Sequence, residues 1–133
     1  MIIGIMGTKN ARVDNIGKYL PPPAQIDKIL INGVGQISKR AKEFAVAHHI
    51  PYKRYYGLMF LQYGKAFAVH RDSALSTDAD TMHFFIADAS GNAPMIMSVY
   101  TSLHRRYTCH VTEAYVNELE KKYPEAAKET PNA

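Results

Sequence analysis

Short apolar runs alternate with helical patterns along the whole chain. Residues 2–6 and 81–87 are continuous apolar runs, as expected of strands that are buried on both faces of a parallel sheet. Weaker runs at 28–32, 52–56 and 106–111 predict further strands, and helical spacing predicts helices at 14–20, 38–49, 62–74, 94–103 and 112–122. Because such strands pair through right-handed crossovers, the pattern predicts one doubly wound α/β domain with about five parallel strands and helices on both faces.

Length and charge narrow the class of protein. The chain has 133 residues and a net charge of +4, so we expect one domain at 1–123 and a polar tail at 124–133. The modest positive charge suits an anionic small molecule. The densest basic stretch is Lys39, Arg40 and Lys42, which we interpret as the solvated face of a helix, so nucleic acid is not an expected partner.

The single cysteine, Cys109, allows no intrachain disulfide, and we expect it to be a buried structural thiol in a reducing compartment. The N-terminus lacks the pattern of a signal peptide, and no stretch approaches the roughly 18 apolar residues of a membrane span. We therefore expect a cytoplasmic protein with no membrane partner. The six histidines show no metal-ligand spacing, so no metal and no cofactor are expected.

Two apolar stripes are candidates for core packing. In the third helical segment, Ala66, Val69 and Ser73 recur at helical spacing. In the fourth, Met95, Met97 and Val99 are expected to belong to the core, with an oligomer contact as the alternative.

The loops at the carboxyl ends of the strands are the predicted ligand site. In an open α/β sheet the crevice forms where the strand order reverses, which for the order 3-2-1-4-5 lies between the first and fourth strands. Glycine, hydroxyl, ammonium and helix N-terminal groups there suit a phosphate, although tight turns also require glycine. The residues at this mouth are Gly7, Thr8, Lys9, Ser90, Gly91 and Asn92.

The segment YGKAFAVHRD, residues 63–72, adds basic groups beside this mouth. Arg71 could clamp a second phosphate through its planar guanidinium, but the spacing favours a structural pair with a carboxylate. Asp72 and Asp88 are the plausible carboxylates of the crevice.

The order of these short motifs resembles a known family. GTK follows the first strand, NGVGQIS follows the second, YGKAFAVHRD comes next, and SGN precedes the fourth long helix. Over about residues 2–111 they are similar to the YspA/cpYpsA-related branch of the SLOG superfamily. The resemblance implies a Rossmann-like fold that binds nucleotides or nucleotide-derived signals. The ligand-binding residues that we expect are Gly7, Thr8, Lys9, Asn32, Gly33, Lys65, Arg71, Asp88, Ser90, Gly91 and Asn92.

Departures from the family pattern favour binding over catalysis. In the second loop, Asn32 replaces a glycine, Gln36 a second glycine, and Ser38 an aspartate, while the fourth loop lacks the glutamate of relatives that cleave N-glycosidic bonds. The leading hypothesis is a module that senses or sequesters a nucleotide-derived ligand and forms a homo-oligomer. The alternatives are a nucleotide N-glycosidic hydrolase that uses Asp72 or Asp88, and a non-catalytic interaction protein that oligomerises.

Overall fold

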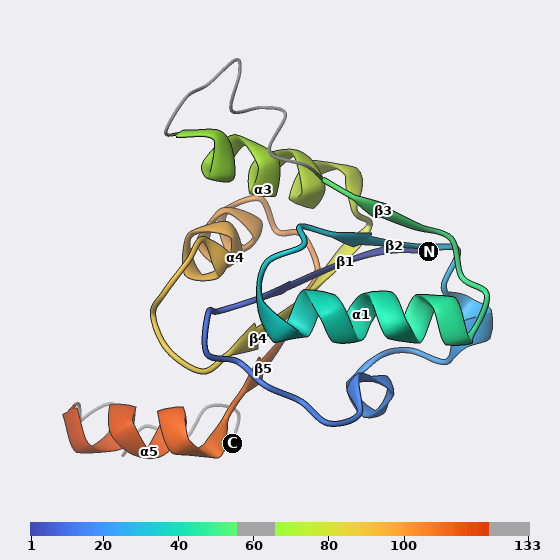
Figure 1. Ribbon diagram of the computed structural model, residues 1–133. Helices are drawn as coiled ribbons and strands as arrows, with labels where there is room; N and C mark the ends of the chain where they lie inside the picture. The colour runs from blue at the N-terminus through green and yellow to red at the C-terminus, as the bar shows by residue number, and fades with distance from the viewer. Residues whose placement is uncertain (56–65, 123–133) are drawn as a thin grey trace.

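The computed structural model describes residues 1–55 and 66–122. Five parallel strands form one sheet in the order β3-β2-β1-β4-β5, so the predicted architecture and strand order are confirmed (Figure 1). The strand order reverses between β1 and β4. The strands are β1 (Ile2–Gly7), β2 (Lys28–Ile31), β3 (Tyr52–Arg54), β4 (Thr81–Ile86) and β5 (Tyr107–Val111).

Helices cover both faces of the sheet (Figure 1). The helix α1 (Gly35–Ala47) packs on one face, and α3 (Phe67–Asp78) and α4 (Ala93–Ser102) pack on the other. The helix α5 (Glu113–Lys122) follows β5 and extends past the carboxyl end of that strand (Figure 1). Between β1 and β2 the chain forms two short 3₁₀ helices, η1 (Ile16–Tyr19) and η2 (Pro23–Gln25). Asn15 caps η1 with its side chain, which accepts the backbone N–H of Gly17.

Alternate strand residues build two apolar clusters. Ile3 and Ile5 of β1 lie on the α1 side, where they join Ile29, Ile31 and Ala41. On the other side, the core under α3 and α4 contains Leu75, Met82, Phe84, Ile96 and Tyr100. None of the helices in the described ranges combines the length and apolar character that crossing a bilayer requires.

The expectation that Ala66, Val69 and Ser73 form the core-facing stripe of α3 was wrong. Val69 is exposed, whereas the buried residues of this helix are Arg71, Asp72, Leu75 and Ser76. A polar pair therefore occupies the buried face at the N-terminal half of α3, which apolar periodicity could not find.

The stripe expected on α4 was wrong for two of its three residues. Met95 and Val99 are 39% and 43% exposed, whereas Met97 is partly buried against the core. The buried residues of α4 are Ala93, Ile96 and Tyr100. Residues two apart, such as 95 and 97, point about 200° apart on a helix, so they cannot share one buried face.

Cys109 was expected to be buried, but it lies exposed on β5. This strand is the last of the sheet, and Tyr107 and Val111 beside Cys109 are exposed as well. The strand itself was predicted correctly. The predicted order 3-2-1-4-5 also puts the fifth strand at an edge of the sheet, and the expectation of a buried thiol did not take that position into account.

Candidate functional site

The loops after β1 and β2 meet at the carboxyl edge of the sheet. The end of β1 packs closely against the first turn of α1. At Gly7 there is no room for a side chain, since a methyl group there would overlap the side chain of Ile37. A methyl group at Gly35 would lie 3.9 Å from the backbone oxygen of Lys9. Lys9, an exposed residue, therefore lies beside the N-terminus of α1.

Hydrogen bonds join the β1 loop to the β4 loop. The buried hydroxyl of Thr8 accepts the backbone N–H of Ala87 (2.9 Å), and the hydroxyl of Ser90 accepts the backbone N–H of Lys9 (3.0 Å). The side chain of Asn10 donates to Asp88 (2.8 Å). The predicted polar groups of these two loops are therefore brought together, but several of them bond to each other.

Asp88 is the acceptor at the centre of the β4 loop. Its Oδ1 accepts the backbone N–H (2.8 Å) and the hydroxyl of Ser90, and its Oδ2 accepts the side chain of Asn10. The hydrogen bonds from Ser90, and less strongly those from Asn10, lower the pKa of Asp88 below its usual value. The carboxylate is thus held in its ionised form and shapes the loop.

A second carboxylate, Asp72, joins three segments of the chain. Its Oδ1 accepts the side chains of Asn32 (3.1 Å) and Arg71 (Nε, 2.9 Å), and its Oδ2 accepts those of Asn92 (2.8 Å) and Arg71 (Nη2, 3.3 Å). Asp72 is only 2% exposed. It fastens the β2 loop and the start of α4 to α3.

The contacts of Arg71 show one of the two roles considered for it. Its guanidinium bonds to Asp72 and lies over the ring of Phe67, with 5.7 Å from Cζ to the ring centroid. The structural pair with a carboxylate, which the sequence favoured, is present. Lys65, the other basic residue predicted in this segment, lies outside the described residues.

The helices α1 and α4, which follow β2 and β4 at this edge, lack a side-chain cap. The helix α3 lacks one as well, with Ala66 as its N-cap residue. The N-cap residue of α1 is Val34, which lies between Gly33 (φ +74°) and Gly35 (φ +75°). The N-cap residue of α4 is Asn92, which follows Gly91 (φ +73°) and gives its side chain to Asp72 instead. Uncapped helix N-termini present backbone N–H groups and a partial positive charge, which favour anions.

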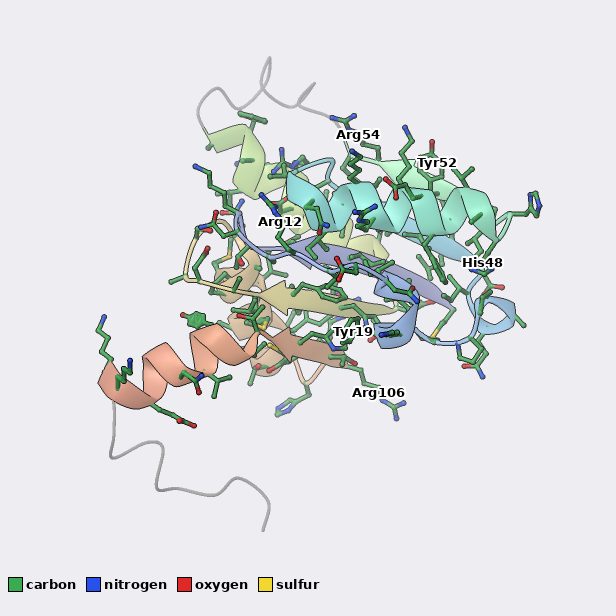
Figure 2. The ribbon with its side chains drawn as sticks, turned by 60° about the horizontal axis from the view of Figure 1, so that its bottom comes forward. Arg12, Tyr19, His48, Tyr52, Arg54 and Arg106 are labelled. Carbon is green, nitrogen blue, oxygen red and sulfur yellow. The ribbon has the colours of Figure 1, made fainter. Side chains whose placement is uncertain are left out.

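Arg54 is a site residue that the sequence reading missed. It ends β3, and a methyl group at Gly33 would overlap its guanidinium, so this cation lies directly over the β2 loop. Figure 2 shows Arg54 near the end of α1 that carries this loop. The signal that could have found it is its position, because the carboxyl end of a third parallel strand reaches the same edge.

Gln36 is a second residue whose role was missed. Its side-chain amide accepts the backbone N–H of Val13 and donates to the backbone oxygen of Val13, both at 2.9 Å. A glutamine in the first turn of α1 therefore holds the chain that leaves the β1 loop.

Comparisons with known proteins identified no relative of the chain. Family models, curated proteins and solved structures were searched, and none matched the chain. Within residues 1–55 and 66–122, no three histidine, cysteine, aspartate or glutamate side chains are grouped to hold a metal ion. What the site offers chemically therefore follows from its own geometry: the N-termini of α1 and α4 lack side-chain caps, which favours an anion.

Proposed function

We propose that the chain binds a phosphate-containing nucleotide or nucleotide-derived ligand at the carboxyl ends of β1, β2 and β4. The observation that carries this proposal is the pair of helix N-termini without side-chain caps, one on each face of the sheet. The β1 loop lies between them, because β1 lies between β2 and β4. A phosphate group would accept N–H groups of the first helical turns, to which Pro94 of α4 contributes none, and would meet the partial positive charge of both helices.

Two cations support a phosphate at this position. The backbone of Lys9, an exposed residue, lies beside the N-terminus of α1, and the guanidinium of Arg54 lies over Gly33 at the end of β3. An ammonium and a planar guanidinium strengthen the hydrogen bonds to an anionic oxygen. The resemblance to the SLOG branch suggests that the phosphate belongs to a nucleotide or a related signal.

The hydrogen bonds of the two carboxylates, Asp72 and Asp88, favour binding of the ligand without turnover. Asp72 already accepts two hydrogen bonds at each oxygen, and Asp88 bonds to Ser90 and Asn10. A general acid or base must have a free acceptor or proton within reach of the substrate. These carboxylates instead order the loops that surround the ligand.

The test is a thermal-shift series with AMP, ADP, ADP-ribose, cyclic dinucleotides and inorganic phosphate. A ligand of this class should stabilise the fold by about 2.7 kcal/mol at a hundredfold excess over its dissociation constant. Lys9→Ala should weaken binding about tenfold or more, because it removes a charged hydrogen-bond donor. Incubation of any bound compound followed by product analysis distinguishes binding from hydrolysis.

Lys39→Ala is the matched control. Lys39 is an exposed lysine on α1, outside the β1 loop, and its loss should leave the dissociation constant unchanged. An equal effect of the two substitutions would mean that only overall charge attracts the ligand. A series in which no compound raises the melting temperature would contradict the proposal.

A further inference from the structure

The two edge strands of the sheet differ in charge. β3 consists of Tyr52, Lys53 and Arg54, all exposed, and two cations on an edge strand repel a second copy of the same strand. β5 reads Tyr107-Thr-Cys-His-Val111 and contains no formally charged residue. Burial lowers the pKa of His110, which favours the neutral form of its imidazole. Only β3 carries the charges by which edge strands avoid pairing.

The backbone of β5 has its outer groups in a regular row. β5 pairs in parallel with β4, and directly after β5 the backbone N–H of Thr112 donates to the backbone oxygen of Ile86. The backbone groups of Thr112 therefore face β4. Because backbone groups of successive strand residues alternate in direction, Tyr107, Cys109 and Val111 turn their N–H and C=O groups toward the open edge. Figure 2 shows β5 as the outermost strand, with Arg106 on the opposite side of the molecule from Arg54.

The exposed side chains of β5 complement their own copy. Tyr107 (37% exposed), Cys109 and Val111 (43%) pair in register with Met82, Phe84 and Ile86, so they share the α4 face. In an antiparallel pair centred on Cys109, each Tyr107 would lie opposite the other copy's Val111. An aromatic residue opposite a β-branched residue is a favourable cross-strand pair.

We propose that β5 pairs antiparallel with β5 of a second copy, about a two-fold axis at Cys109. The pairing would join two five-stranded sheets into one and supply partners for the outward groups of Tyr107, Cys109 and Val111. The charge of β5 favours a second copy as its partner, because two β5 strands without formally charged residues pair without repulsion. In the same register, Arg106 of one copy would lie opposite Thr112 of the other, which directly precedes Glu113. This contact lies outside the proposed ligand site and does not depend on it.

The single cysteine makes the register testable. Opposite residues of a hydrogen-bonded antiparallel pair have Cα atoms about 5.5 Å apart, within the range that a disulfide spans. Sedimentation velocity of the full chain should give twice the monomer mass of 14.9 kDa. Mild oxidation with diamide should then link the two copies through Cys109, as a dimer band on a non-reducing gel.

Substitutions at Cys109 separate pairing from the thiol itself. Cys109→Lys places two like charges on the axis and should give a monomer, whereas the neutral Cys109→Ser should stay dimeric without forming the cross-link. Tyr52→Lys adds the same charge to the exposed β3 edge and should stay dimeric. Circular dichroism shows whether each variant is folded.

Three results would overturn the proposal. The wild-type chain could sediment as a monomer at every concentration, or Cys109→Lys could stay dimeric while folded. A wild-type dimer that forms no cross-link under oxidation would overturn the register centred on Cys109.

Discussion

At the scale of single residues, Asp72 carries the most interactions of the candidate site. It is buried and accepts hydrogen bonds from residues of three separate segments, Asn32, Arg71 and Asn92. A carboxylate can accept all of these bonds, because it has only acceptor sites. The geometry of the β2 loop and of the start of α4 therefore depends on one negative charge.

Asp72→Asn should destabilise the fold by about 3 kcal/mol, because it leaves Arg71 as a buried charge without a carboxylate. The new NH2 group would also point a donor at the amide donor of either Asn32 or Asn92, which bond to different oxygens of Asp72. The free energy of unfolding in urea measures the loss. Asp14→Asn, at an exposed position, should change it by less than about 0.5 kcal/mol. Similar small losses in both variants would mean that Asp72 has no structural role.

At the scale of elements, close packing of β1 against α3 depends on the absence of a side chain at Gly4. A methyl group there would lie 2.9 Å from a Leu75 methyl and 3.2 Å from Cβ of Ala79, and would overlap the sulfur of Met82. The separation between the central strand and the helix layer on this face is therefore set by one glycine.

Gly4→Ala should lower the free energy of unfolding by about 1–3 kcal/mol, because the added methyl group overpacks this contact. Leu75→Ala made in the same chain should remove part of that strain, so the double variant should be more stable than the sum of the single losses predicts. The measurement is a double-mutant cycle of urea unfolding. Strictly additive losses would show that Gly4 and Leu75 do not compete for the same space.

At the scale of the whole molecule, we expect a pair of histidines to make the stability of the fold depend on pH. Nδ1 of His83 lies 3.4 Å from Nε2 of His110 on the neighbouring strand, and His83 is only 5% exposed. Burial, with a smaller contribution from His110, lowers the pKa of His83 to about 4 from its ordinary value of 6.5. Between these two values the unfolded chain binds a proton that the folded chain does not.

Stability should therefore be complete above pH 6.5 and fall as the pH decreases toward 4, by up to roughly 3 kcal/mol from His83. Urea unfolding across this window measures the slope. His83→Leu should flatten it. His104→Asn is the control, because His104 is exposed at φ 54°, a conformation that asparagine tolerates, and it should leave the slope unchanged. An equal slope in wild type and His83→Leu would contradict the assignment.

Much of the architecture was predictable because it follows from local pattern. Apolar runs identified the strands, glycine and proline marked several element ends, and alternation of strands and helices implied parallel pairing. The order 3-2-1-4-5, which comes from the doubly wound fold class, is the order of the sheet. The same rule placed the loops after β1, β2 and β4 at one edge. The pairing of Arg71 with a carboxylate was also the favoured interpretation, since Asp72 is its neighbour.

What only the tertiary structure decided concerns contacts between distant segments. The four hydrogen bonds of Asp72 join residues up to 40 positions apart, and Arg54 meets Gly33 across two strands. Exposure of Cys109 and of Val99 followed from an edge position and a helix rotation, which periodicity does not define. A sequence determines which residues form each element, because that depends on near neighbours. Which polar groups satisfy one another, and which edge of the sheet stays open, is decided only when the elements pack together.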